Sequence, residues 1–224
     1  MPRMIAGVDD AGRGPIIGPL VVAGISVDEE MAKSLFGMGV RDSKMLTPDS
    51  RTQLAARIRQ VAHKVSSVEV QPKEIDEVVT HGRRLRRLNY LEAKLMAQVI
   101  NELSPDEVYV DASDVNEQRY AESIAELLKP ELRNIGIVSR HHADRTYPVV
   151  SAASIIAKVR RDEAVGLLRR EYGDFGSGYI SDPRTIEFLK EWRRSHAEYP
   201  PIVRLSWKTI REIEQEIGQS RLGS

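Results

Sequence analysis

The sequence predicts an α/β fold in which strands and helices alternate to about residue 172 and a helical C-terminal part follows. Short β-rich apolar runs alternate with longer segments whose apolar residues recur at helical spacing. The chain has 224 residues, of which 41% are hydrophobic, so it can bury a substantial core. We therefore expect a core domain over residues 1–172 and a helical segment over residues 173–224 that packs on it.

The individual elements follow from apolar spacing and from turn residues. Thr47 is a good N-cap with Pro48 at the first helical position, and Leu54, Ile58 and Val61 follow at helical spacing. Glycine and proline mark a loop after residue 172. In chain order we expect strands over residues 4–10 and 18–27, a helix over 47–64, a strand over 65–71, a helix over 88–103, a strand over 106–111, a helix over 116–129, a strand over 134–144, a long helix over 149–172, and helices over 184–196 and 206–218.

Composition excludes several classes of protein and leaves others open. Lys plus Arg and Asp plus Glu both total 33, so the net charge neither indicates nor excludes a nucleic-acid partner. The absence of Cys removes disulfides, thiolate nucleophiles and thiolate metal sites. No apolar run approaches the ~18–20 residues of a membrane span, and no signal-like segment follows the first residues, so we expect a cytoplasmic protein.

Four acids follow apolar strands at the points where the strands end: Asp9, Asp10, Asp111 and Asp144. In alternating α/β sheets the ligand crevice lies outside such strand ends. A single Asp there commonly just starts a turn. Carboxylates gathered in one crevice repel each other unless cations neutralise them, and hard divalent ions prefer oxygen ligands. The pattern therefore predicts a site for two Mg²⁺ or Mn²⁺ ions that catalyses phosphoryl displacement.

Two other kinds of site are less well supported. His141 and His142 suggest zinc, but neighbouring residues on a strand point to opposite faces and cannot easily share one ion. Ser151 and Ser154 have no evident triad partner, and a helix-packing role explains them more simply.

Five motifs in order along the chain resemble type 2 ribonuclease H (ribonuclease HII), most closely its archaeal form. They are GVDDAGRGPIIGPLVVAG, RDSKMLTP, VYVDASDV, HHADRTYPVVSAASIIAKVRRD and GSGYISDPRT, and the resemblance runs from about Ile5 to Lys208. It implies a ribonuclease H-like fold with a mixed central sheet, flanking helices and a helical C-terminal segment. It also implies an endonuclease that cuts the RNA strand of RNA/DNA hybrids and incises 5′ of ribonucleotides in duplex DNA, leaving 3′-hydroxyl and 5′-phosphate ends.

The resemblance also implies roles for single residues. The family's metal-binding acids correspond to Asp9, Asp10, Asp111 and Asp144, the same residues that the strand-end pattern selects. Its Gly-Arg-Gly motif, associated with the ribose 2′-hydroxyl, corresponds to Gly12, Arg13 and Gly14; the alternative is a simple turn. Its junction-sensing tyrosine corresponds to Tyr179, while Lys44 and Lys158 correspond to phosphate-neutralising positions.

The chain departs from the family pattern at two places beside the acids. Position 10 has Asp where the family has Glu, which is one methylene longer, and His142 stands where archaeal relatives usually have Lys. Asp10 leaves open the alternative of a catalytically weakened hybrid-binding protein, and a third reading keeps the fold with another nucleic-acid substrate. The C-terminus lacks the aromatic residues of a clamp-binding box, so we expect no sliding-clamp recruitment, and we expect a monomer.

Overall fold

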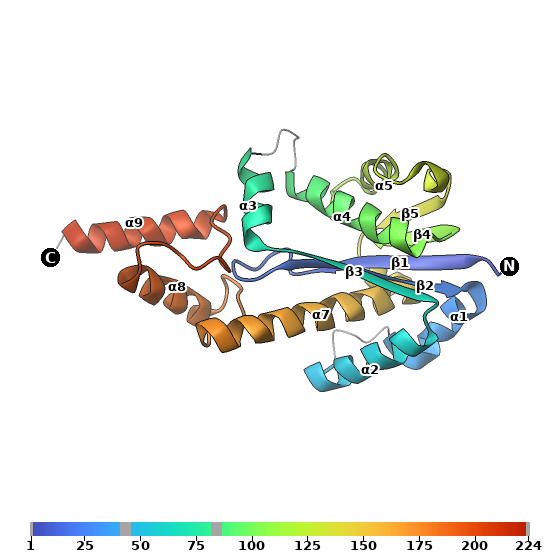
Figure 1. Cartoon of the computed structure of the whole chain (residues 1–224), viewed down its shortest axis with the longest axis horizontal. Coiled ribbons are helices and arrows are strands. Elements are labelled where there is room, and N and C mark those ends of the chain that lie inside the picture. The colour runs from blue at the N-terminus through green and yellow to red at the C-terminus, as the bar shows by residue number, and fades with distance from the viewer. Residues whose placement is uncertain (1, 41–45, 82–86, 223–224) are drawn as a thin grey trace. The chain divides into compact units, whose positions relative to one another are not determined.

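The structure is a computed structural model that describes residues 2–40, 46–81 and 87–222 (Figure 1). Backbone contacts divide these residues into two compact units. Unit 1 contains residues 2–11, 21–40, 46–69 and 87–161, and unit 2 contains residues 12–20, 70–81 and 162–222. Lys44, expected to contact phosphate, lies outside the described residues. The domain boundary at residue 172 stays a prediction.

Five strands of the described chain form one mixed sheet in the order β3-β2-β1-β4-β5. The strands are β1 (Met4–Ala11), β2 (Leu20–Asp28), β3 (Lys64–Val70), β4 (Glu107–Asp111) and β5 (Gly136–Arg140). β1 is antiparallel to β2, whereas β1 with β4 and β4 with β5 are parallel. Val8 pairs with Val110 in the parallel register. The next residue of each strand is an acid, so the register brings Asp9 and Asp111 to the same edge of the sheet.

The helices follow the expected pattern with a few additions. They are α1 (Glu29–Ser34), α2 (Pro48–Val61), α3 (Pro72–His81), α4 (Arg87–Leu103), α5 (Glu117–Ala125), α6 (Ala143–Thr146), α7 (Pro148–Tyr172), α8 (Pro183–Ser195) and α9 (Lys208–Leu222). Short 3₁₀ helices lie at Leu35–Met38 and Pro130–Leu132. The predicted N-cap of α2 is confirmed, because the Thr47 side chain accepts a hydrogen bond from the Ser50 N–H.

Helices cover both faces of the sheet in unit 1. α4 and α5 lie on one face, and α1, α2 and the first part of α7 lie on the other (Figure 1). Two strand glycines allow this close packing. A Cβ at Gly7 would lie 2.3 Å from the Val149 carbonyl at the start of α7, and one at Gly24 would lie 2.8 Å from Val99 of α4. The start of α7 is therefore in backbone contact with β1 at Gly7, which is two residues before Asp9.

Unit 2 has a hydrophobic core of its own. Ile16 and Ile17, from the segment that follows β1, pack with Phe175 and with apolar residues of α8 and α9 such as Leu189 and Ile213. The Phe175 ring also contacts Phe188 edge-on at a centroid distance of 5.8 Å. The segment after β1 is thus a buried structural part of unit 2.

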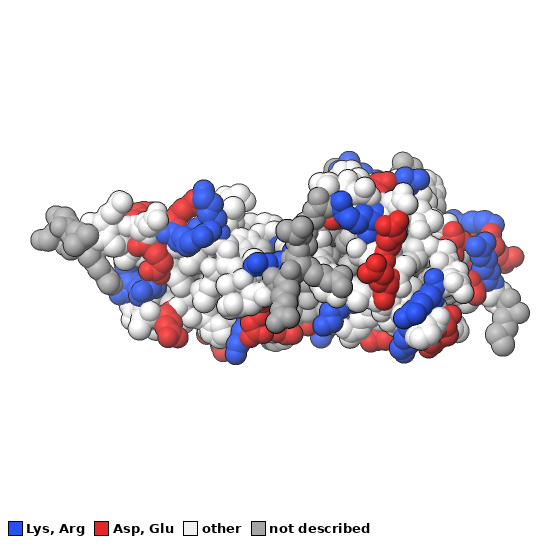
Figure 2. Space-filling view, turned by 90° about the horizontal axis from the view of Figure 1, so that it is seen from above, with Lys and Arg blue, Asp and Glu red and all other residues white. Residues whose placement is uncertain are grey.

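Within the described part of the chain, no helix has the length and apolarity needed to cross a membrane. The face of the molecule seen in Figure 2 carries basic and acidic side chains interspersed, in keeping with the equal totals of the two.

Candidate active site

The first part of the candidate site lies in unit 1, at the C-terminal ends of β1 and β4. Asp9 is buried, and its Oδ1 accepts a hydrogen bond of 2.8 Å from the Asp10 backbone N–H. Asp10 is half-buried on the neighbouring position of β1, and Asp111 is the last residue of β4. The structure thus brings together three of the four acids expected at strand ends.

Electrostatics single out Asp9 among these acids. Burial raises the pKa of Asp9 well above its ordinary value, and the negative charges of Asp10 and Asp111 raise it further. The Ser154 side chain and the hydrogen bond from the Asp10 backbone N–H lower this pKa in part. The result is a buried carboxyl group under strong negative potential, which is an environment that a bound cation would relieve.

Asp144 reaches the same region by a route that differs from the expected one. The predicted strand over residues 134–144 is wrong at its end, because β5 stops at Arg140 and Asp144 lies in the short helix α6. His142 takes a left-handed backbone conformation with φ of 56°, which ends the strand. The Ala143 N–H then donates to Asp111 Oδ1 at 2.8 Å, so Asp144 directly follows a residue bonded to Asp111.

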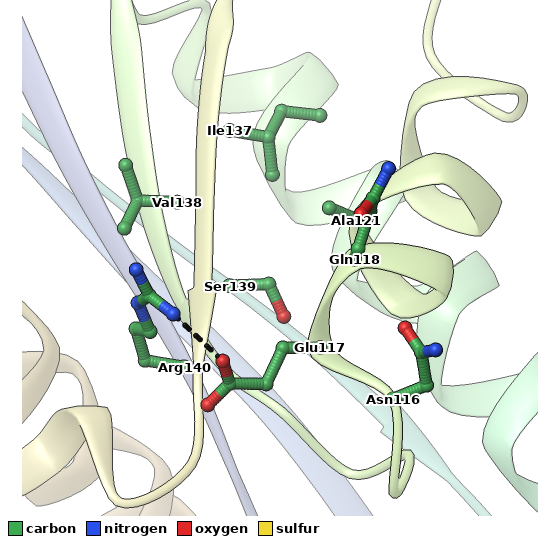
Figure 3. A pocket seen from close by; sticks show the side chains of 8 residues that line it. All are labelled: Asn116, Glu117, Gln118, Ala121, Ile137, Val138, Ser139 and Arg140. Atoms are coloured by element: carbon green, nitrogen blue, oxygen red, sulfur yellow. Dashed lines mark hydrogen bonds and ion pairs between the residues drawn. The ribbon is translucent and has the colours of Figure 1, made fainter.

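An acid that the sequence does not single out fastens the turn before α6. Glu117, at the start of α5, accepts hydrogen bonds from the His141 backbone N–H at 2.7 Å and from the Arg140 guanidinium at 2.9 Å (Figure 3). These two contacts lower the pKa of Glu117. In Figure 3 Arg140 and Glu117 point toward each other among the residues of β5 and α5 that line a pocket. Glu117 therefore helps to hold the turn that leads to Asp144.

Two buried serines on α7 lie near the acids. The Ser154 side chain lowers the pKa of Asp9, and the Ser151 hydroxyl donates to the Asp144 backbone carbonyl. The Ser151 hydroxyl thus bonds the backbone of α6 and not a carboxylate, and the expected packing role of both serines stays a prediction.

Asp114 is a buried acid that the sequence also fails to single out. Its carboxylate accepts hydrogen bonds from Asn89 at 2.9 Å, from Asn116 N–H at 2.9 Å and from Arg119. These partners fix the loop that follows Asp111 against the starts of α4 and α5.

The chemistry of this donor set fits a hard divalent cation. It consists of carboxylate oxygens, and the mutual influence of Asp9, Asp10 and Asp111 on pKa leaves negative charge to be balanced. In the described ranges, no group of three or more His, Asp or Glu side chains has the arrangement needed to hold a metal ion. Metal binding by Asp9, Asp10, Asp111 and Asp144 consequently stays a prediction.

A second group of candidate residues lies in unit 2 and contains the Gly-Arg-Gly motif. Gly12 has φ of 93°, a left-handed conformation that favours glycine. A Cβ added at Gly14 would lie 3.7 Å from Cε1 of Tyr179, so the tyrosine ring lies beside Gly14. The Gly178 carbonyl accepts hydrogen bonds from the N–H groups of Ile16 and Ile17 at 2.8 and 3.2 Å. The structure therefore joins the two motifs that are 165 residues apart in the chain.

The remaining predicted contact residues are partly buried. Arg13 is half-buried between the two glycines, and Lys158 is half-buried on α7 in unit 1. Tyr179 is more exposed, with 41% of its surface accessible.

Known proteins are similar to this chain over nearly all of its length. The family model described as Ribonuclease HII matches residues 6–210, which is most of the chain. The curated Ribonuclease HII of Methanosarcina barkeri is 47% identical over 220 residues, with 96% of each chain covered.

Solved structures give the same result. The crystal structure of ribonuclease H2 from Pyrococcus horikoshii OT3 superposes with a TM-score of 0.86 at 44% identity, covering 95% of this chain and 98% of that one. The Archaeoglobus fulgidus RNase HII, solved as a PCNA:RNase HII complex, gives 0.83 at 40% identity, covering 93% and 96%. The predicted ribonuclease H-like fold, a mixed sheet with flanking helices and a helical C-terminal segment, is confirmed. On its motifs, its fold and these matches, the chain belongs to the ribonuclease HII family.

Proposed function

We propose that this chain incises duplex DNA on the 5′ side of embedded ribonucleotides, besides cutting the RNA strand of RNA/DNA hybrids, in a reaction that depends on divalent metal. The ribonuclease HII family cleaves the RNA of such hybrids, and the chain is accordingly an endonuclease of the hydrolase class. Incision at single ribonucleotides, the use of two metal ions, and the 3′-hydroxyl and 5′-phosphate products belong to the proposal.

One observation carries the metal-dependent part of the proposal. Asp9 is buried, and the negative charges of Asp10 and Asp111 raise its pKa, so the three carboxylates repel each other at one edge of the sheet. A protein that only bound nucleic acid would gain nothing from negative charge there, because the charge repels phosphate. We find no observation that favours the catalytically weakened binding protein.

Asp9, Asp10, Asp111 and Asp144 would hold Mg²⁺ or Mn²⁺ in this proposal. Bound metal would supply an activated water molecule and would stabilise the leaving oxygen of the phosphodiester. The protein's own part is to keep the carboxylates in place. The Asp10 N–H orients Asp9, the Ala143 N–H orients Asp111, and Ser151 binds the carbonyl of Asp144.

The Gly-Arg-Gly loop and Tyr179 supply selectivity for ribose in the same proposal. Backbone groups at Gly12 and Gly14 can approach a sugar closely because no Cβ intervenes. The 2′-hydroxyl is both donor and acceptor, and it is the group that distinguishes RNA from DNA. The half-exposed Tyr179 ring beside Gly14 could pack on the adjoining sugar. Lys44 and Lys158 are proposed to neutralise phosphates.

The test is incubation with a labelled DNA duplex that contains one ribonucleotide, in Mg²⁺, Mn²⁺ or EDTA. We expect one cut on the 5′ side of the ribonucleotide in either metal and none in EDTA. An all-DNA duplex of the same sequence is the matched control and should stay intact. Full cutting in EDTA, or equal cutting of the control duplex, would contradict the proposal.

Partners other than nucleic acid remain predictions. The Archaeoglobus fulgidus relative was solved as a complex with PCNA, and that statement concerns that protein. For this chain we keep the expectations of a monomer, of a cytoplasmic location and of no clamp recruitment through the C-terminus.

A further inference from the structure

Arg204 is a fully buried arginine whose partners belong to the segment that contains Gly-Arg-Gly. It has 0% of its surface exposed. Its guanidinium donates to the Gly12 carbonyl at 2.6 Å, to the Arg13 carbonyl at 2.8 Å and to the Gly18 carbonyl at 2.9 and 3.0 Å. All these residues are in unit 2. One cation thus holds three backbone carbonyls of one loop.

The residues around Arg204 run alongside that loop and are bonded to it repeatedly. We call residues 202–207 the strap. The Gly18 N–H donates to the Ile202 carbonyl at 2.9 Å, and the Arg204 N–H donates to the Ile16 carbonyl at 2.9 Å. At the end of the strap, Trp207 Nε1 donates to the Gly14 carbonyl at 3.2 Å, and its ring lies 5.0 Å from the Arg204 guanidinium.

An acid from α3 fixes the strap as well. Asp76 accepts hydrogen bonds from the Leu205 N–H at 2.7 Å, from the Ser206 N–H at 2.9 Å and from the Ser206 hydroxyl at 2.6 Å. The backbone at Arg204 is therefore bonded to Ile16, and the two residues that follow it are bonded to Asp76. This leaves the arginine little freedom to move away from the loop.

Planar peptide groups connect these contacts to recognition. The C=O of one residue and the N–H of the next lie in one rigid plane and point in opposite directions. By holding the carbonyls of Gly12 and Arg13, Arg204 also fixes where the N–H groups of Arg13 and Gly14 point. Those N–H groups point away from the guanidinium. A donor to a ligand oxygen needs this orientation.

We propose that Arg204 is a positioning residue for ribose selectivity: it holds the Gly-Arg-Gly backbone in the conformation that reads a 2′-hydroxyl. The inference rests on the proposed function, because it takes the loop as the reader of the sugar. Lysine cannot replace Arg204 fully. A guanidinium presents five N–H donors in a rigid fork, whereas an ammonium concentrates its donors on one atom and reaches fewer of the three carbonyls.

The test compares Arg204→Lys with Arg193→Lys, a control in the same unit. Arg193 also donates to a backbone carbonyl, that of His196, but lies on α8 and pairs with Glu214. The substrates are duplexes with a single ribonucleotide or a single 2′-fluoro nucleotide, which lacks the hydroxyl donor. We expect Arg204→Lys to lower kcat/KM on the ribonucleotide duplex at least tenfold. The ratio of kcat/KM on the ribonucleotide duplex to kcat/KM on the 2′-fluoro duplex, the ribo-to-fluoro ratio, should also fall. Calorimetric Mn²⁺ binding should be unchanged, and Arg193→Lys should stay within twofold of the parent.

A second readout does not depend on activity. Backbone NMR order parameters of Arg13 and Gly14 should fall in Arg204→Lys and stay constant in Arg193→Lys. Unchanged order parameters, or a folded Arg204→Lys protein with parental selectivity, would overturn the proposal. If the parent fails to cut the ribonucleotide duplex while the order parameters fall as expected, the proposed function fails, and with it the selectivity role, and Arg204 only holds the loop backbone.

A third variant covers the case in which Arg204→Lys does not fold. Trp207→Phe removes only the indole donor to Gly14 and keeps an aromatic ring beside Arg204. We expect Trp207→Phe to lower the ribo-to-fluoro ratio by less than tenfold and to leave the thermal midpoint unchanged. A Trp207→Phe protein with parental selectivity and parental order at Gly14 would overturn the role of the strap.

Discussion

At the residue scale, the most unusual group is Asp9, a buried carboxyl whose pKa is raised by burial and by the charges of Asp10 and Asp111. A raised pKa in the folded state means that the folded protein holds the proton more strongly than the unfolded chain does. In the absence of metal, stability therefore falls as pH rises from the unfolded pKa of about 3.9 through the raised value. At neutral pH the Asp9 charge opposes folding unless a cation balances it.

Asp9→Asn should accordingly raise the thermal midpoint of the metal-free protein at pH 7 and abolish incision. The difference in midpoint should vanish near pH 3, where both side chains are neutral. Thermal unfolding in EDTA at the two pH values, with cleavage measured alongside, checks this. Asp49→Asn, at an exposed acid in the first turn of α2, is the control and should not raise the midpoint. Lost activity with a collapsed midpoint would make Asp9 a structural acid.

Position 10 leads to a directional prediction about metal preference. The resemblance to the family implies Glu there, so the shorter Asp10 places its carboxylate oxygen nearer the strand than a longer acid would. Mg²⁺ requires near-ideal octahedral geometry and should be affected by this difference more than Mn²⁺. Asp10 is half-buried, so its side chain is in part open to solvent.

We therefore expect Asp10→Glu to raise the Mg²⁺-supported rate about tenfold, equivalent to about 1.4 kcal/mol, and to lower the ratio of Mn²⁺ to Mg²⁺ activity. Rates at saturating concentrations of each metal measure this. Asp111→Glu is the matched control, because the Ala143 N–H already fixes Asp111, and it should slow the reaction in both metals. An unchanged or higher ratio in Asp10→Glu would show that the backbone is already adapted to Asp.

At the element scale, α8 begins at a charged cap that also supports the loop containing Tyr179. Asp182 accepts hydrogen bonds from the Ser177 N–H at 2.7 Å and from the Arg184 N–H at 3.0 Å. These contacts, with the Ser177 backbone first, lower the pKa of Asp182 to about 2. The stabilisation is present above the unfolded pKa of about 3.9 and is lost as pH falls through about 2.

Asp182→Asn keeps an oxygen that can cap α8 but removes the charge, so it should lower the thermal midpoint at pH 7. The difference in thermal midpoint between the parent and Asp182→Asn should disappear between pH 4 and pH 2. Asp182→Ala removes the cap as well, and its deficit should persist at pH 2. Midpoints measured for the three proteins across this range decide the matter, and a gap that is independent of pH would contradict the role of the charge.

Elements with a strong local pattern could be predicted from the sequence, and others could not. α2, α4 and α7 have apolar spacing or capping residues that are visible in one segment. α1 and α3 were not predicted, because α1 has only 6 residues and α3 comes directly after a strand. α6 replaced the end of a predicted strand because the backbone at His142 is left-handed, which no local pattern indicates.

The candidate site shows the same limit. Acids at strand ends are recognisable because strands and their ends can be read locally. Arg204 is not recognisable, because its partners Gly12 and Gly18 are 192 and 186 residues away and a lone arginine in a loop resembles an ordinary surface charge. Long-range contacts of this kind exist only in the fold.

At the scale of the whole molecule, the two groups of residues in the proposed function belong to different compact units. The acids lie in unit 1, whereas Gly-Arg-Gly, Tyr179 and Arg204 lie in unit 2. Metal binding and sugar recognition should therefore respond to different substitutions. A change in one unit can leave the chemistry of the other intact.

Stability measurements can separate these two functions without any substrate. A ligand that binds only the folded state stabilises it by RT ln(1 + [L]/Kd), or about 2.7 kcal/mol at a hundredfold excess over Kd. We expect Mn²⁺ to raise the thermal midpoint of the parent protein and of Arg204→Lys by similar amounts. Asp111→Asn should lose most of this rise, because one of the acids has become neutral. A full Mn²⁺ response in Asp111→Asn would mean that the metal binds elsewhere, and a lost response in Arg204→Lys would mean that the loop in unit 2 also governs the carboxylates of unit 1.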